Sequence, residues 1–242
     1  MYITIHKVFK HHRRDFNRDT KLDFLVLNNF DDTLNIISDG LHSDSFSFTQ
    51  SHGTGMTPSM ALFVDLNGDG IKDSITTNYR EGILSIRYGE KGGCFRKQSK
   101  LALAEGVNSI AAGNLNRDHK LDLVVANYIE NSITVLMSQA NKTFSVSQKI
   151  LNVSKPKSIR LVKLNEDDYL DIVVAQFSKN NVRIFLGQQD GTFVPGETFK
   201  TGIRPTRIQL ADMNQDGKLD LIVVNSGSNH ISILMGDDQQ KY

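Results

Sequence analysis

The stretch DLNGDGIKD at residues 65–73 and the stretch DMNQDGKLD at residues 212–220 share one pattern of acidic, amide and glycine residues. Three related stretches are DFNRDTKLD at 15–23, NLNRDHKLD at 114–122 and KLNEDDYLD at 163–171. Their first residues are 49 or 50 positions apart along the chain. Self-similarity with a period of about 20 to 50 residues is typical of solenoids, propellers and arrays. The chain is therefore a repeat protein, and the acidic stretch marks each repeat.

Residues outside the acidic stretches keep the same spacing. A proline lies seven residues before three of the stretches, at Pro58, Pro156 and Pro205. An aromatic residue lies thirty residues after the first position of four stretches, and after the first stretch it is displaced by one. The aromatic residues are Phe46, Phe95, Phe144, Phe193 and Tyr242. These landmarks indicate a structural repeat and not a set of isolated acidic motifs.

Each repeat predicts four short strands. An apolar run precedes the acidic stretch, and a β-branched run too short for a helix follows it, as at 221–224. A third strand alternates polar and apolar residues, as in Val182, Ile184 and Leu186. A glycine-bearing turn, as at 187–193, leads into a fourth and more polar strand. No segment has the period of a helix.

Four strands repeated at this period are typical of a β-propeller blade. We expect an all-β fold, a β-propeller of five four-stranded blades, either complete or a fragment of a larger propeller. A parallel β-helix would repeat over a shorter period, and a β-sandwich would lack the fixed landmarks. The expected single domain is 1–242, with repeats at approximately 1–46, 47–95, 96–144, 145–193 and 194–242.

The acidic stretches offer oxygen ligands at alternate positions. The third position is Asn and the fifth and ninth are Asp in all five stretches. Oxygen ligands without His or Cys suit Ca²⁺, which accepts carboxylates, amides and backbone carbonyls together. The pattern begins like an EF-hand loop, but the twelfth position holds Thr76 or Val223 in place of glutamate, and the flanks are predicted strands. The EF-hand interpretation therefore fails.

Two stretches are expected to bind Ca²⁺ best, because they combine three carboxylates with Gly70 or Gly217 at a left-handed turn. Their ligands are Asp65, Asn67, Asp69, Ile71, Asp73, Asp212, Asn214, Asp216, Lys218 and Asp220, with backbone carbonyls from Ile71 and Lys218. Two others are expected to be weaker, since Thr20 and His119 replace the glycine and Asn114 replaces a carboxylate. Their ligands are Asp15, Asn17, Asp19, Lys21, Asp23, Asn114, Asn116, Asp118, Lys120 and Asp122, with backbone carbonyls from Lys21 and Lys120.

The stretch at 163–171 is expected to be metal-free at Asn165, Asp167 and Asp171, because Lys163 stands at its first position. The Lys163 ammonium is expected to replace the ion by bridging Asp167 and Asp171. The alternative for every stretch is an Asx-turn between strands without metal. That alternative is favoured for 163–171, whereas the ninth-position Asp lies beyond the reach of a local turn.

Composition and motifs exclude several classes of function. The 28 basic and 27 acidic side chains leave a net charge of +1, so we expect neither a nucleic-acid partner nor an anionic membrane. No apolar run approaches the 18 or so residues of a membrane-spanning helix, so no membrane insertion is expected. The single cysteine, Cys94, cannot form an internal disulfide. No nucleophile elbow, zinc-protease motif or phosphate-binding loop is present, and we expect no enzyme.

The pattern D-x-N-x-D-G-x-x-D, followed by an apolar strand and a G-x-x-D-G-T-F turn, resembles the FG-GAP and VCBS-type repeats. These repeats occur in the integrin alpha head and in many secreted or surface proteins. The resemblance covers nearly the whole chain from about residue 15. It implies calcium loops on one rim and ligand contacts from loops on a rim or side. Family propellers commonly close with seven blades, whereas this chain has five acidic loops.

The N-terminal repeat departs from the family pattern. The charged and imidazole residues at 10–14 replace the expected apolar inner strand and argue against a packed strand there. Residues 2–9 are the candidate for the missing fourth strand of the last repeat. The N-terminus also lacks the apolar run of a secretory signal, so an exported chain is expected to be a fragment.

We expect a calcium-stabilised, non-catalytic scaffold that is monomeric and recognises or adheres to a protein or glycan partner at a propeller rim. Two glycosylation sequons, at Asn141 and Asn152, support an extracellular or cell-surface location. Two alternatives stay open. One is a lectin-like propeller, with Tyr79, Tyr88 and Tyr128 as the nearest sugar-stacking candidates in a chain without Trp. The other is a propeller appended to a secreted hydrolase or lyase.

Overall fold

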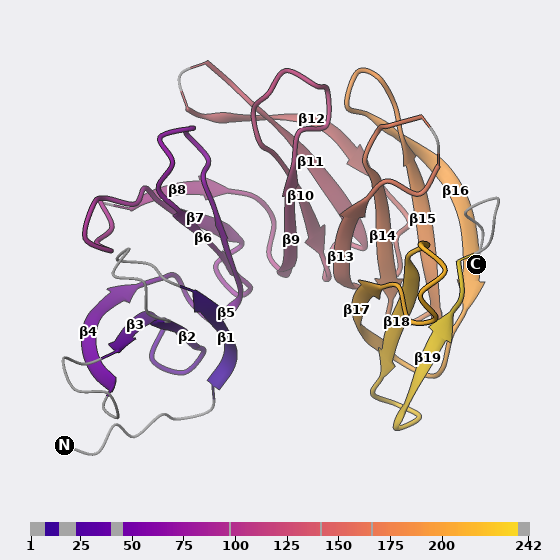
Figure 1. The fold of residues 1–242 in the computed structure, drawn as a ribbon, viewed down its shortest axis with the longest axis horizontal. Coiled ribbons are helices and arrows are strands. Elements are labelled where there is room, and N and C mark those ends of the chain that lie inside the picture. The colour runs from indigo at the N-terminus through magenta and orange to yellow at the C-terminus, as the bar shows by residue number, and fades with distance from the viewer. Residues whose placement is uncertain are drawn as a thin grey trace. The chain divides into compact units, whose positions relative to one another are not determined.

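The computed structural model describes residues 8–14, 23–39, 46–96, 98–140, 142–165 and 167–236. All regular elements in these ranges are strands, in five antiparallel sheets (Figure 1). None of the described residues forms a helix of the length and hydrophobicity that a membrane span requires. The chain divides into two compact units, Met1–Val107 and Asn108–Tyr242. The expected all-β fold is therefore confirmed.

The first unit contains two four-stranded sheets. The strands of the first sheet are β1 (Val8–Arg14), β2 (Asp23–Asn28), β3 (Thr33–Asp39) and β4 (Phe46–Gly53). Those of the second are β5 (Pro58–Val64), β6 (Asp73–Asn78), β7 (Ile83–Arg87) and β8 (Ser99–Ala102). Each strand pairs with its neighbour in the chain, so both sheets are meanders. The apolar core between them contains Leu25, Leu27, Leu34, Ile36 and Ala61.

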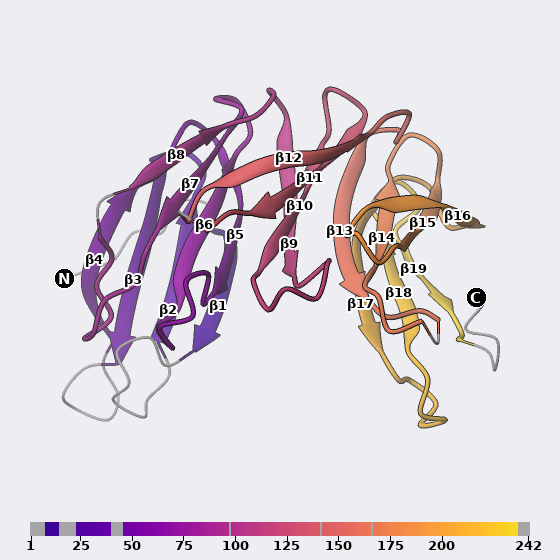
Figure 2. The same ribbon diagram turned by 90° about the horizontal axis from the view of Figure 1, so that it is seen from above.

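The second unit contains the next two four-stranded meanders and a sheet with three described strands (Figure 2). The first consists of β9 (Val107–Gly113), β10 (Asp122–Asn127), β11 (Ser132–Ser138) and β12 (Phe144–Ile150). The next consists of β13 (Pro156–Val162), β14 (Asp171–Gln176), β15 (Asn181–Gly187) and β16 (Phe193–Lys200). The last consists of β17 (Pro205–Ala211), β18 (Asp220–Asn225) and β19 (His230–Leu234). The prediction of four strands per repeat is confirmed for four of the five sheets.

The second strand of each sheet is the most deeply buried. All six residues of β10 and of β14 are buried, as their apolar β-branched sequences predict. One core in the second unit joins Val124 and Val135 to Ile159 and Phe185 of the next sheet. The same layering continues toward β17 and β18. Apolar burial between consecutive sheets is thus the main force that assembles each unit.

In three of the sheets, a turn is also bound to the entry of the next sheet. The turn residue between the second and third strands has a positive φ there, and its side-chain oxygen accepts the N–H of the residue that precedes the proline of the next sheet. The pairs, with N–H to oxygen distances, are Thr57 to Asp32 at 2.7 Å, Lys155 to Asn131 at 2.9 Å and Arg204 to Asn180 at 2.9 Å. Consecutive sheets are therefore joined by polar contacts as well as by apolar packing.

In the N-terminal repeat, Val8–Arg14 forms the strand β1, whose backbone pairs with β2, with an irregularity between Val8 and Lys10. The side chains of this strand lie outside the described part of the structure, so the expectation that they do not form a packed inner strand stays a prediction. Residues 1–7, most of the proposed fourth strand for the last sheet, lie outside the described residues, and Val8 and Phe9 belong to β1.

Candidate metal-binding loops

The acidic loops all connect the first strand of a sheet to its second strand. Residues 65–73 lead from β5 to β6, and residues 114–122, 163–171 and 212–220 occupy the same place in the later sheets. Of the first acidic stretch only Asp23, which begins β2, is described. The predicted ligands Asp15, Asn17, Asp19 and Lys21 lie outside the described residues. Four loops can therefore be compared at the same end of their sheets.

All four loops have the same left-handed turn. The sixth position has a positive φ in each, at Gly70 (80°), His119 (65°), Asp168 (66°) and Gly217 (84°). The fourth position does too wherever it is described, at Gly68 (74°), Arg117 (62°) and Gln215 (63°). The predicted role of Gly70 and Gly217 at a left-handed turn is confirmed. The other loops adopt the same backbone with side chains that pay a steric cost for it.

The first-position carboxylate gathers the N–H groups of its own loop. Asp65 accepts from Gly68 at 2.7 Å and Asp69 at 3.1 Å on Oδ1, and from Gly70 at 2.7 Å on Oδ2. Asp212 is bound in the same way by the N–H groups of Asp216 and Gly217. Asp65 Oδ2 accepts a single N–H group and so has a further lone pair for a cation, whereas Asp65 Oδ1 already accepts two. The arrangement is compatible with a metal ligand and with a local Asx-type turn.

The third and fifth positions are linked to each other. Asn67 donates its Nδ2 hydrogen to Asp69 Oδ2 at 2.9 Å, and Asn67 Oδ1 accepts the Asp69 N–H at 3.0 Å. Asp69 Oδ1 accepts the N–H of Ile71 at 2.8 Å. The last loop repeats these contacts at Asn214, Asp216 and Lys218. In the third loop, Asn116 Oδ1 accepts the Asp118 N–H, and Asp118 Oδ1 accepts the Lys120 N–H. The structure therefore brings the predicted ligands of positions one, three and five together around one turn.

The ninth-position Asp has a role that the sequence analysis missed. Asp73 is fully buried, and its Oδ2 accepts the Leu66 N–H at 2.7 Å while its Oδ1 accepts the Gly89 N–H at 2.8 Å. The other three sheets repeat both contacts. The ninth-position residues there are Asp122, Asp171 and Asp220, and the distances are 2.7–3.0 Å. This carboxylate fixes the acidic loop to the turn after the third strand, a role its presence in all five stretches could have indicated.

Carboxylates crowd around the buried Asp. Burial raises the pKa of Asp73, the N–H groups of Gly89 and Leu66 oppose the rise, and the carboxylates of Asp69 and Asp65 add to it. Burial likewise raises the pKa of Asp122, with a contribution from Asp118. A divalent cation in the loop would relieve this repulsion between like charges.

The donor set of loop 65–73 fits calcium only if amide and backbone oxygens take part. In the described residues, no group of three or more His, Cys, Asp and Glu side chains has the arrangement of a metal site. Asp65, Asp69 and Asp73 would hold Ca²⁺ together with the amide oxygen of Asn67 and the carbonyl of Ile71. The mixed set of oxygen ligands is one that Ca²⁺ accepts and most transition metals do not prefer.

The loops 114–122 and 163–171 each contain a buried acceptor oxygen without a partner. Asn114 Oδ1, at the first position of 114–122, is buried and receives no hydrogen bond. Asn165 Oδ1, at the third position of 163–171, is in the same condition. A buried acceptor without a donor costs free energy, and a cation would compensate for it.

Lys163 does not bridge Asp167 and Asp171, which corrects the expected ion replacement. Its ammonium pairs with Asp168 at 2.8 Å. Asp168 holds the left-handed sixth position of the loop and is exposed, so its carboxylate is accessible to the ammonium. Arg117 of the preceding loop donates to the Asp167 carbonyl at 3.1 Å. Side-chain contacts of Lys163 and Arg117 therefore reach the sixth and fifth positions of loop 163–171.

The last residue of each second strand forms a further repeated contact that the sequence analysis missed. It is an amide residue whose side-chain NH₂ donates to a side chain of the third strand. The residues are Asn28, Asn78, Asn127, Gln176 and Asn225, whose 49- or 50-residue spacing could have revealed them. This row lies at the opposite end of the sheets from the acidic loops, because it ends the strand that the acidic loop begins.

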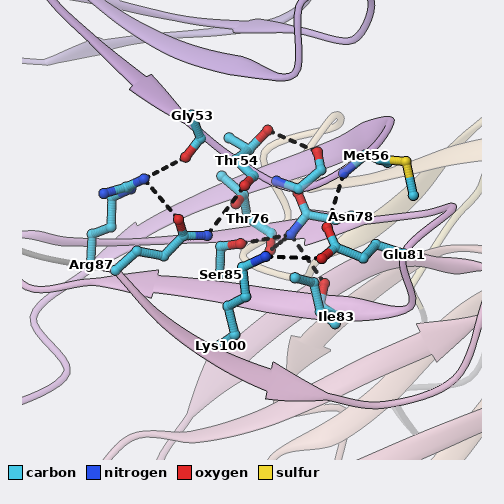
Figure 3. A network of polar contacts seen from close by, with 12 residues as sticks. Gly53, Thr54, Met56, Thr76, Asn78, Glu81, Ile83, Ser85, Arg87 and Lys100 are labelled. Atoms are coloured by element: carbon cyan, nitrogen blue, oxygen red, sulfur yellow. Dashed lines mark hydrogen bonds and ion pairs between the residues drawn. The ribbon is translucent and has the colours of Figure 1, made fainter.

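Around Asn78 the row expands into a polar network (Figure 3). Asn78 donates to Ser85 Oγ at 2.8 Å and accepts the Gly55 N–H at 2.9 Å. Glu81 accepts the Met56 N–H at 3.1 Å and pairs with Lys100 at 2.9 Å. The network fastens the segment between β4 and β5 to the second sheet, which indicates a structural role.

Comparison with known proteins identifies the family. Residues 65–125 and 163–223 match the model of the FG-GAP-like repeat, and each match spans two acidic loops. The matched residues make up half of the chain, and the chain belongs to the family of FG-GAP-like repeat proteins. The expected resemblance is confirmed. No curated protein matches the chain significantly.

Solved structures share the fold at low sequence identity. A functionally unknown protein from Desulfotomaculum acetoxidans has a TM-score of 0.60 and 15% identity, and the match covers 88% of this chain and 65% of that one. BBS1N in its complex with ARL6DN has a TM-score of 0.60 and 12% identity, covering 92% and 66%. A protein from Lactobacillus plantarum has a TM-score of 0.63 and 14% identity, covering 88% and 67%. The chain therefore spans about two thirds of the length of these structures.

Proposed function

We propose that this chain is a calcium-binding β-propeller, or part of one, that acts as a non-catalytic scaffold for recognition of a protein or glycan partner. The observation that carries the proposal is the convergence of oxygen-bearing side chains over a glycine turn in the loops 65–73 and 212–220. Buried ninth-position carboxylates add negative charge to the same turn. An all-oxygen loop of this kind favours Ca²⁺ over other biological cations.

The blade assignment rests on the repeated meanders. Each four-stranded sheet is a meander, and the fourth strand β12 is largely exposed, as the outer strand of a propeller blade would be. In the second unit the first strands β13 and β17 lie beside each other, as the inner strands of consecutive blades do. The number of blades that close the ring is left open by this proposal.

Bound calcium would neutralise the negative charge of the acidic turn and hold its backbone in place. Asp65 and Asp212 would bind the ion while continuing to accept N–H groups. Asp73 and Asp220 would fix the loop to the body of the sheet. Such loops commonly have affinities of about 10⁻⁴ to 10⁻³ M outside cells, which fits an extracellular or cell-surface location. Asn152, the described sequon residue, is exposed after β12 and supports the same location.

Isothermal titration of the chelator-treated chain with Ca²⁺ and with Mg²⁺ tests the proposal. We expect at least two calcium ions per chain, with little response to Mg²⁺. The double variant Asp65→Ala with Asp212→Ala should lose these two sites. Asp190→Ala is the matched control, since Asp190 lies in an outer turn and binds Thr192. A variant that retained wild-type calcium binding would contradict the assignment of these loops.

A further inference from the structure

We propose that five residues at the end of the sheets opposite the acidic loops form a binding site for an acidic peptide segment of a partner protein. The residues are Tyr128, Lys155, Lys157, Phe177 and Arg204, and together they are called the basic–aromatic edge. All five belong to the second unit. The inference rests on the proposed recognition function and names the chemistry of its partner.

Two junctions between consecutive sheets build this edge. Tyr128 follows β10 and Phe177 follows β14, so both rings lie in turns between second and third strands. Lys155 and Arg204 precede the prolines that begin β13 and β17, where Asn131 and Asn180 bind their N–H groups. The same contact that joins two sheets therefore places a cation beside the aromatic turn of the preceding sheet.

Distances within the edge show that the cations and rings form one cluster. The Nζ atoms of Lys155 and Lys157 lie 5.1 and 5.0 Å from the ring centroid of Tyr128. The ring of Phe177 packs edge-on to Tyr128 at 6.0 Å between centroids. The Arg204 guanidinium lies 5.7 Å from the Phe177 centroid. Cation–aromatic attraction holds three positive groups close together on one surface.

These three cations have no carboxylate partner among the described residues. Neither Lys155, Lys157 nor Arg204 takes part in a described ion pair, and Glu130, two residues beyond Tyr128, is paired with Lys149 at 2.8 Å. The charges of the edge are therefore not neutralised within the described chain. An anionic ligand would neutralise them and would be held by charge-assisted hydrogen bonds.

Lys157 is held in place by a neighbouring strand. Its Nζ donates to Asn108 Oδ1 at 3.1 Å, and Asn108 Nδ2 donates to the Lys157 carbonyl at 2.7 Å. Burial lowers the pKa of Lys157. A lysine positioned in this way loses less side-chain entropy on binding than a freely moving surface lysine.

The surroundings favour a peptide over a glycan. Ile129 and Ile203 are 41% and 51% exposed and adjoin Tyr128 and Arg204 in the chain. Exposed apolar groups beside cations suit a segment that mixes acidic and apolar side chains. A sulfated sugar would use the cations but not the isoleucines, and the cations beside the Tyr128 and Phe177 rings compete with sugar stacking.

The equivalent positions in the first unit lack the cations. At the first junction, Thr57 is equivalent to Lys155 and Asn29 is equivalent to Tyr128. At the next junction, Gly106 is equivalent to Lys155 and Tyr79 to Tyr128. The repeat therefore does not require a basic residue at this position. The basic residues at these junction positions are thus a feature of the second unit, which is consistent with a binding site and not with a structural demand of the fold.

Fluorescence anisotropy with a labelled peptide of Asp, Glu and Leu tests the inference, with the same peptide carrying Asn and Gln as its uncharged counterpart. We expect saturable binding of the acidic peptide only, weakened by added salt. The double variant Lys155→Gln with Lys157→Gln should weaken binding by about tenfold or more. The matched control, Lys142→Gln with Lys200→Gln, removes two exposed lysines of the same unit and should bind as the wild type.

Three results would overturn the inference: no binding, equal losses in both double variants, or preferential binding of a heparin-derived oligosaccharide that the edge variant abolishes. Thermal melts verify that each variant is folded, and Arg204→Gln supplies a second variant at an exposed side chain. The same preparations separate the two proposals. A wild-type chain that responds to calcium but does not bind the peptide would refute only the proposed peptide site. A wild-type chain that binds the peptide but does not respond to calcium would refute only the proposed calcium binding.

Discussion

The loops 65–73 and 114–122 have one backbone and two different sets of side chains. Both turn through positive φ at the fourth and sixth positions, and both are fixed by a buried ninth-position Asp. Yet Asp65 accepts three N–H groups, whereas Asn114 leaves a buried oxygen without a partner. The buried Asp therefore fixes the loop to the sheet in both cases, while the first position sets the charge of the loop, and we propose that this charge decides its capacity for calcium.

Removing the ninth-position carboxylate should have the largest effect, and the effect should be equal in both loops. In the wild type, the fully buried carboxylate of Asp73 or Asp122 accepts two backbone N–H groups. Substitution of either residue by Ala leaves these two N–H groups without an acceptor. We expect each to lower the free energy of unfolding by about 2 to 4 kcal/mol in EDTA. Urea denaturation measures the loss. A loss in only one of the two loops would contradict the shared role of this Asp.

Removing the first-position side chain should distinguish the two loops. Asp65→Ala frees three N–H groups that water can reach, so we expect a loss of about 1 kcal/mol in EDTA. The larger consequence should be the loss of one calcium site. Asn114→Ala should leave calcium binding at 65–73 and 212–220 unchanged. Calorimetric titration of the two single variants measures the calcium binding of each. Equal losses of calcium binding would contradict the predicted difference between the two loops.

Converting the third loop to the pattern of the second should move it toward calcium binding. His119→Gly relieves a side chain at a φ of 65° and is expected to add about 0.5 kcal/mol of stability without metal. Asn114→Asp in the same chain supplies the missing carboxylate. We expect one additional calcium ion per chain by titration. An unchanged stoichiometry would mean that the first and sixth positions do not decide metal capacity.

The smallest effect is expected at Lys163, which pairs with the exposed Asp168 instead of bridging the ligand positions of its loop. Solvent screens such a pair, so Lys163→Ala should leave the melting temperature in EDTA unchanged within error. The equivalent substitution at Lys200, an exposed lysine of β16, is the control. A clear destabilisation by Lys163→Ala alone would restore a structural role for this ammonium.

Much of the fold could be predicted because the repeat is carried by local patterns. Apolar β-branched runs became the buried strands β10 and β14, and the positive φ of Gly70 and Gly217 followed from their place in the turn. The backbone pairing of β1 with β2 was not predicted, because residues 10–14 lack the apolar pattern of a strand and backbone hydrogen bonds do not depend on that pattern.

The candidate site was predicted less completely, and for a physical reason. The spacing of the acidic residues shows which side-chain oxygens can approach one another, but not which backbone N–H groups donate hydrogen bonds to them. The second N–H bound by Asp73 comes from Gly89, sixteen residues later, and only the folded sheet brings the two together. Lys163 likewise could reach several carboxylates, and the left-handed turn at Asp168 selected among them.

We propose that calcium in the two glycine loops stabilises the chain, and the most direct test is a thermal melt in EDTA, in Mg²⁺ and across a Ca²⁺ titration. If the two sites bind with a Kd of about 0.1 mM, 2 mM Ca²⁺ should add about 1.8 kcal/mol for each. The account predicts a calcium-specific rise in melting temperature that is lost in Asp65→Ala with Asp212→Ala. A well-folded chain whose melting temperature does not respond to calcium would contradict the account, and the loops would then be structural turns.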